Sequence, residues 1–129
     1  MRGEADLDQL MASMSPELRP GTFVFATVAE VGDLPALMTF QEADGITVIL
    51  ERDVAEAHGL EGAFACRMIT LNVHSALDAV GFLARITTAL AAKGMGVNPV
   101  SAFNHDHLFV PENRAEEAMA TLHGLVRGP

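Results

Sequence analysis

The sequence predicts an α+β protein made of two small units, and three observations lead to that prediction. Runs rich in β-branched and aromatic residues, typical of strands, occur in both halves of the chain. In the second half the expected elements follow the order strand, helix, strand, strand, helix, which begins the ferredoxin-like βαββαβ arrangement with its antiparallel sheet. The 129 residues, half of them hydrophobic, suffice for one ordinary domain or for two very small ones sharing a core.

The first half is predicted to contain three strands and two short helices. Residues 5–14 place apolar side chains three and four positions apart, which is typical of a short amphipathic helix. Residues 22–28 form a strand by composition, and residues 36–41 and 45–51 form a hairpin across a short acidic link that ends in glycine. Residues 52–60 complete this half as a short helix closed by a glycine.

The second half contains a clearer pattern. Residues 67–73 are an apolar strand, and residues 80–94 have the spacing of a helix that a glycine ends. Residues 96–103 and 106–111 follow as two short strands, and residues 112–125 form an acidic amphipathic helix. The apolar positions expected along the two helices are Val80, Leu83, Ile86 and Leu90 on the first and Ala115, Ala118, Met119 and Leu122 on the second.

One strand of the six-element arrangement is missing from the second half. We therefore expect two units that complete each other, an incomplete one over residues 1–61 and another over residues 62–129. Residues 22–28 are a candidate for the missing strand, and a dimer partner is the alternative source. Pro99 predicts that residues 96–103 form an edge strand or carry a bulge, because proline cannot donate a backbone hydrogen bond.

Charge and composition exclude several functions. The net charge is -9 and Lys93 is the only lysine, so a nucleic-acid backbone or an anionic membrane would repel the protein. The acidic N-terminus does not resemble a signal peptide, and no apolar run approaches the roughly 20 residues that span a bilayer. The single cysteine, Cys66, lies among apolar residues and is interpreted as a small buried hydrophobe. We expect a cytoplasmic protein.

The segment "FNHDHLFVP" is the most distinctive polar motif. On a strand, His105 and His107 share one face with Phe109, while Asp106 lies on the opposite face with Leu108 and other apolar residues. Two imidazoles could bind one ion, but a catalytic zinc needs three protein ligands and a structural zinc usually four. No third ligand has a suitable spacing, so we expect no metal. No serine-nucleophile or phosphate-binding motif occurs either, so we expect neither an enzyme nor a cofactor.

The segment "VGFLARITTALAAKGMGVNPVSAF" resembles an ACT domain, a small ferredoxin-like module that commonly senses amino acids. The resemblance is carried by Gly81 at the helix start, by the apolar helix positions after it, and by Gly94 before the strand that contains Val97. From about Met14 onward, the order of the strand and helix segments is similar to that of small bacterial proteins with two ACT-like units and no assigned function.

The resemblance implies a ligand site at the loop "HSALDAVG", residues 74–81, at an interface between two modules. The helix N-terminus behind Gly81 would face a ligand carboxylate. Asp78 would accept a hydrogen bond from an ammonium group, or would cap the helix. Asn98 would contact the ligand or satisfy a bulge in its strand. The implied ligand-binding residues are Leu77, Asp78, Ala79, Val80, Gly81 and Asn98. Val80 occupies a position where ACT sequences often have proline.

Three functions are compatible with the sequence. The leading hypothesis is a non-catalytic, homodimeric ACT-type regulatory protein that binds a small molecule, an amino acid in the first instance. The second is a ligand-free protein-interaction module that pairs through its sheet edges. The third is a small metal-dependent enzyme that uses His105 and His107. The sequence names neither the ligand nor the partner protein.

Overall fold

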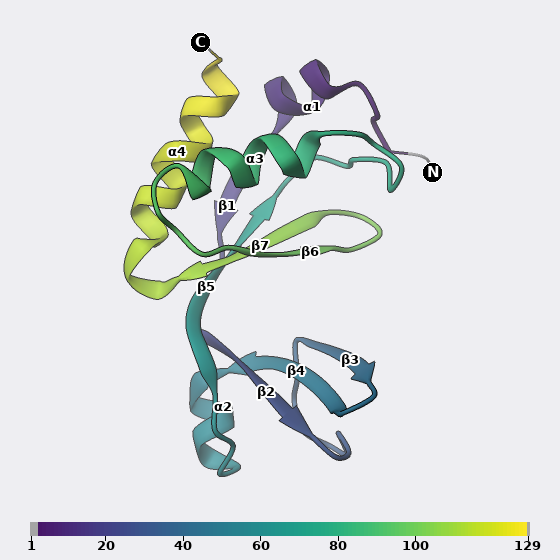
Figure 1. Cartoon of the computed structure of the whole chain (residues 1–129), viewed down its shortest axis with the longest axis vertical. Coiled ribbons are helices and arrows are strands. Elements are labelled where there is room, and N and C mark those ends of the chain that lie inside the picture. The colour runs from purple at the N-terminus through teal and green to yellow at the C-terminus, as the bar shows by residue number, and fades with distance from the viewer. Residues whose placement is uncertain (1–2, 129) are drawn as a thin grey trace. The chain divides into compact units, whose positions relative to one another are not determined.

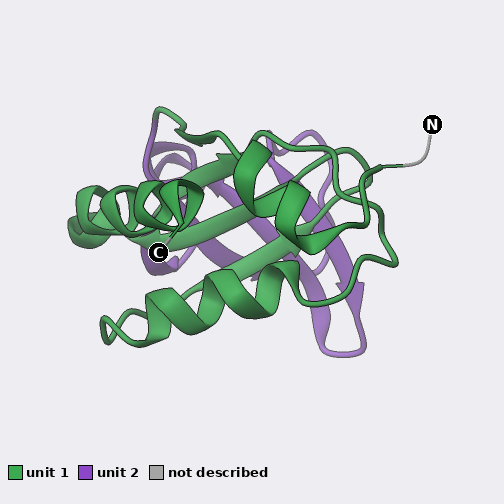
Figure 2. Cartoon of the chain, turned by 90° about the horizontal axis from the view of Figure 1, so that it is seen from above, with its two compact units in different colours: residues 1–20, 67–129 green, residues 21–66 purple. Residues whose placement is uncertain are grey.

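The computed structural model describes residues 3–128 (Figure 1). Within these residues the chain divides into two compact units, which Figure 2 shows in different colours. Unit 1 contains the chain up to Pro20 and from Arg67 onward, and unit 2 contains Gly21–Cys66. The expected boundary between residues 61 and 62 lies close to the second of these junctions, whereas the first 20 residues group with the later part of the chain. The division into domains over residues 1–61 and 62–129 stays a prediction.

Unit 2 consists of one antiparallel sheet and one helix. Its elements are β2 (Phe23–Val28), β3 (Met38–Glu42), β4 (Gly45–Glu51), α2 (Arg52–Ala57) and the first residues of β5 (Ala63–Leu71). The strands lie in the order β3, β4, β2, β5. The expected hairpin is confirmed, with Glu42 opposite Gly45 in the register.

The core of unit 2 is small and apolar. Val24, Val48, Leu50 and Ala55 are buried together, so strands and helix share one cluster. Cys66 is fully buried as predicted, and its thiol donates to the Phe23 carbonyl at 3.3 Å.

Unit 1 contains the ferredoxin-like arrangement. Its elements are α1 (Leu7–Ser13), β1 (Pro16–Leu18), the later residues of β5, α3 (Phe82–Ala91), β6 (Asn98–Ser101), β7 (Asp106–Pro111), a 3₁₀ turn (Glu112–Arg114) and α4 (Ala115–Arg127). The strand order is β1, β5, β7, β6. β6 is therefore an edge strand, as Pro99 predicted.

The missing strand is β1 and not residues 22–28, which corrects the expectation from the sequence. β1 pairs antiparallel with β5, Pro16 lying opposite Leu71 and Leu18 opposite Ile69. Residues 23–28 instead pair along their whole length with β4, a partner of matching length and β-branched composition. β1 has only three residues and begins with proline, so its sequence gives little indication of a strand.

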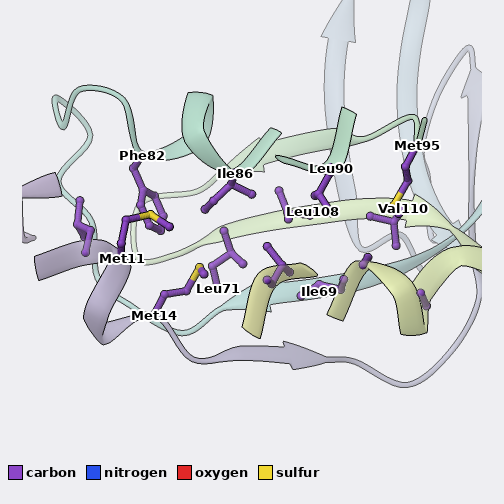
Figure 3. Packing of buried hydrophobic residues seen from close by; sticks show 14 residues of the cluster. Met11, Met14, Ile69, Leu71, Phe82, Ile86, Leu90, Met95, Leu108 and Val110 are labelled. Atoms are coloured by element: carbon purple, nitrogen blue, oxygen red, sulfur yellow. The ribbon is translucent and has the colours of Figure 1, made fainter. Parts of the chain in front are cut away.

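The core of unit 1 lies between its sheet and three helices. Leu10 of α1, Ile86 of α3 and Leu122 of α4 are fully buried against Ile69 of β5 and Leu108 of β7, and Figure 3 shows labelled side chains of α1, α3 and both strands converging. The first 20 residues thus complete both the sheet and the hydrophobic core of this unit.

Helix α3 begins later than expected. Val80 precedes the helix and is 83% exposed, and Leu83 is only partly buried. Phe82 occupies the first core position and is followed four and eight residues later by Ile86 and Leu90. The predicted face of α4 is confirmed, with Ala115, Ala118 and Leu122 buried and Met119 packed at the edge of the core.

Candidate functional site

The loop 74–81 joins β5 to α3 and is held by the N-terminal segment. The Glu4 amide donates to the His74 carbonyl at 2.7 Å, and the Ala76 amide donates to the Glu4 carbonyl at 2.8 Å. Gly3 lies so close to the loop that a Cβ there would come within 2.5 Å of the Ser75 carbonyl carbon. A residue larger than glycine would therefore displace the loop or the segment that holds it.

The N-cap position of α3 is occupied by a glycine. Gly81 is the N-cap residue, in the left-handed region with φ +91°, and it has no side chain that could accept a hydrogen bond from the helix. Asp78 lies three residues before Gly81, so it is not the N-cap residue that the sequence suggested. The first amides of α3 therefore donate to no side chain of the N-cap residue, and they form the positive end of the helix dipole.

A small cavity lies beneath the loop and the start of α3, and we call it the Asp106 cavity. Its volume is about 140 Å³. Leu77, Ala79 and Gly81, three of the residues predicted from the sequence, line it. Ser75 and Asp106, which the prediction did not include, line it as well.

Asp106 is the only buried acidic side chain among residues 3–128, with 5% of its surface exposed. It is the first residue of β7 and has the same strand parity as Leu108 and Val110, which lie in the core. The Ser75 hydroxyl donates to Asp106 Oδ2 at 2.9 Å. The burial of a carboxylate is costly unless its oxygens gain partners, so this residue is unusual for an apolar core.

A second, more open cavity lies beside the same loop, and we call it the Phe103 cavity. Its volume is about 400 Å³, and His74, Leu77, Asp78 and Phe103 are among its lining residues. The Leu77 and Phe103 side chains are 68% and 64% exposed. Ser75, Ala76 and Leu77 line both cavities, so the loop forms a common wall.

Two predicted residues line neither cavity. Val80 points to solvent, with 83% of its surface exposed. Asn98 is exposed on β6, where it lies opposite Phe109 in the register. The predicted set is therefore divided between the two cavities and the surface. Asp106 could have been found from strand parity, because an acidic residue occupied a position expected to face the core.

Three histidines form a row beside the Phe103 cavity. The ring centroids of His74 and His105 are 6.5 Å apart, and those of His105 and His107 are also 6.5 Å apart. His107 Nδ1 lies 3.0 Å from the Thr70 hydroxyl. Across the described chain, no group of three or more histidine, cysteine or acidic side chains is arranged to hold a metal ion.

The environment of His107 disfavours its protonation. Desolvation by burial is the main cause that lowers the pKa of His107, and the charges of His105 and Arg19 lower it further. The Asp106 carboxylate acts in the opposite direction and does not outweigh them. The imidazole that contacts Thr70 is therefore held in its neutral form to a lower pH than an ordinary histidine.

None of the helices between residues 3 and 128 has the length and apolar character needed to cross a membrane. This finding is consistent with the absence of a long apolar run in the sequence.

Two family models, both for the ACT domain, match the chain over residues 2–67 and 64–124. No protein of curated function matches it significantly. Among solved structures, a Vibrio cholerae protein of unknown function, described as a possible transport protein, is 39% identical with a TM-score of 0.85. That match covers 93% of this chain and 95% of the other.

More distant structures show the same fold. An Agrobacterium tumefaciens protein is 18% identical, with a TM-score of 0.71 over 88% of this chain and 89% of its own. The ligand-free regulatory subunit of aspartate kinase from Thermus thermophilus is 11% identical, with a TM-score of 0.65 over 88% of this chain and 99% of its own. With two matches to ACT-domain models that together span most of its length, the chain belongs to the ACT-domain family.

Proposed function

We propose that the protein is a non-catalytic, cytoplasmic regulatory protein that binds a small molecule, an amino acid, in the Asp106 cavity. The observation that carries the proposal is the position of this cavity, between the loop 74–81 and the N-terminus of α3. ACT domains are typically regulatory, and several of the solved structures with this fold are regulatory parts of aspartate kinases.

The site has the chemistry to hold a carboxylate. The α3 N-terminus would contribute about 0.3–1 kcal/mol through its dipole, and each charge-assisted hydrogen bond about 1.5–3 kcal/mol. After the cost of immobilising the ligand, these terms correspond to affinities between micromolar and millimolar. Such affinities suit a protein that responds to changes in metabolite concentration.

A homodimer is part of the proposal. Leu77 and Phe103 at the Phe103 cavity and Val80 in the loop are large apolar side chains that are 64–83% exposed. Exposed apolar side chains that cluster around a cavity are typical of surfaces that another protein covers. A second subunit on this surface would enclose the loop, and ligand binding would then favour one arrangement of the subunits. Light scattering at tens of micromolar should give twice the chain mass.

The alternative is an interaction module without a ligand. The edge strands β6 and β3 each have one strand neighbour in the described chain, so both leave one side open for pairing with another protein. In that case the cavity at the loop would be a packing feature, and no metabolite would change the stability of the protein.

Thermal unfolding in the presence of each of the twenty amino acids distinguishes the two functions. A ligand at a hundred times its dissociation constant should stabilise the protein by about 2.7 kcal/mol. Ala84→Leu, at an exposed helix position on the cavity wall, should remove this stabilisation. Ala120→Leu makes the same change at an exposed position of α4 away from the loop and should preserve it. No stabilisation by any amino acid at millimolar concentration would favour the interaction module.

A further inference from the structure

The Asp106 carboxylate is only partly satisfied by the protein itself. It has one hydrogen bond, from Ser75 to Oδ2, whereas an ionised carboxylate can accept about four. Within the described chain no lysine or arginine forms an ion pair with it. A carboxylate that is 5% exposed and lines a cavity therefore retains acceptor capacity directed at whatever occupies that cavity.

The walls of the Asp106 cavity differ in electrical character. Gly81 and Phe82 bring the N-terminal end of α3, with its donors and positive dipole end, to one part of the lining. Asp106 and Ser75 bring a negative charge and a hydroxyl to another part. A ligand that is neutral overall but carries both charges matches these walls better than a simple anion, which Asp106 would repel.

The size of the cavity restricts the ligand further. A volume of about 140 Å³ lies below the roughly 300–1,000 Å³ of sites for drug-sized ligands. The apolar part of the lining combines the small side chains of Ala76, Ala79 and Ala84 with the larger ones of Leu77, Phe82 and Leu83, which leave little room for a long ligand side chain. The cavity is suited to an amino acid with a short side chain.

We propose that Asp106 recognises the ammonium group of a small α-amino acid and thereby excludes carboxylic acids that lack an amino group. The proposal rests on the function proposed above and assigns to Asp106 the role that the sequence suggested for Asp78. Ser75 acts as a positioning residue, because its hydroxyl fixes one carboxylate oxygen and links Asp106 to the loop. The same loop residue is bridged to Glu4, so ligand contact at Asp106 is coupled to the N-terminal segment.

The test compares ligands that differ only at the amino group. Glycine, L-alanine and L-serine are titrated calorimetrically against the wild-type protein, alongside glycolate, L-lactate and L-glycerate, in which a hydroxyl replaces the ammonium group. At least one amino acid should bind about 10- to 100-fold more tightly than its hydroxy analogue, which is the range expected for a charge-assisted hydrogen bond. Equal affinities within every pair would overturn the proposal, and this comparison needs no variant.

Asp106→Asn provides the second arm, because it keeps the shape of the side chain and an oxygen that accepts from Ser75. It should weaken binding of the amino acid about 10- to 100-fold and leave the hydroxy analogue unchanged or more tightly bound. Unchanged amino-acid affinity in this variant would overturn the role of Asp106 while the proposed function stands. If only larger amino acids stabilise the protein, the expected limit on the ligand's side-chain length is wrong, and the role of Asp106 is then tested with those larger ligands. If no amino acid binds at all, both the role of Asp106 and the proposed function are wrong.

Discussion

Removal of residues 1–20 should unfold unit 1, although these residues lie far in sequence from most of that unit. Leu10, Met11 and Met14 are 0%, 6% and 2% exposed in its core. Full burial of each such side chain contributes about 1.5–3 kcal/mol, so the three together contribute about 5–9 kcal/mol. The deletion also exposes one edge of β5 that β1 now covers. Whole domains are stable by only about 5–15 kcal/mol.

Circular dichroism and urea unfolding of a chain that begins at Gly21 test this reasoning. The truncated chain should lose most of the signal of α3 and α4 and should not unfold cooperatively as the full chain does. A synthetic peptide of residues 3–20, added in excess, should restore both properties, because it supplies the missing strand and core side chains. Residues 62–129 alone should fail to fold for the same reason.

Two leucine variants calibrate the magnitude. Leu10→Ala, in the full chain, should cost about 2–5 kcal/mol because it leaves a cavity in the core. Leu37→Ala is the matched control at a side chain that is 49% exposed, and it should cost less than about 0.5 kcal/mol. A chain without residues 1–20 that melts cooperatively at the temperature of the full protein would refute the assignment of these residues to unit 1.

Three further predictions concern single positions. Gly81→Ala should destabilise the protein by about 1–2 kcal/mol, because alanine is strained at the φ of +91° that Gly81 adopts. Gly124→Ala, inside α4, should stabilise the protein by up to about 1 kcal/mol, because alanine has the higher helix propensity. The two variants should shift the melting temperature in opposite directions. Burial, and then the charge of His105, lower the pKa of His107, so its contribution to stability is present above the unfolded-state pKa and is lost as the pH falls through the folded-state pKa. His107→Gln should therefore reduce the loss of unfolding free energy that urea unfolding measures between about pH 7 and 5. A variant with the same pH profile as the wild type would count against this prediction. Protein made without a histidine tag should contain no stoichiometric zinc by elemental analysis, and one ion per chain, lost in His107→Ala, would contradict this.

Most of the fold could be predicted because the longer elements have clear periodicity. Residues 45–51 are a short run of mostly β-branched residues, and the helix that contains Ile86 and Leu90 repeats apolar residues at helical spacing. The short strand at Pro16 could not be predicted, since three residues carry no period and the pairing partner lies more than fifty residues away. Its position is determined by tertiary pairing with β5, which local sequence does not encode.

For the candidate site, the prediction from the sequence included the loop that lines the Asp106 cavity but not the charged residue in it. The resemblance located residues 74–81, and Leu77, Ala79 and Gly81 do line the Asp106 cavity. Asp78 was expected to face a ligand, yet the buried carboxylate belongs to Asp106, which reaches the loop from a different strand. Contacts between separate strands and loops depend on the packing of the whole unit. The resemblance therefore pointed to the loop, but the prediction did not include Asp106, which lies on β7.

The sequence of unit 2 is inserted within that of unit 1, and this order has a consequence for synthesis on the ribosome. The segment that contains β1 leaves the ribosome before its core partners, which extend to Leu122 of α4. At about 5–20 residues per second, those partners follow only after roughly 5–20 s. During this interval Leu10 and its apolar neighbours stay exposed, while residues 21–66 are already available to fold. Chaperone binding to the nascent chain should therefore concentrate on the first 20 residues and end when α4 emerges.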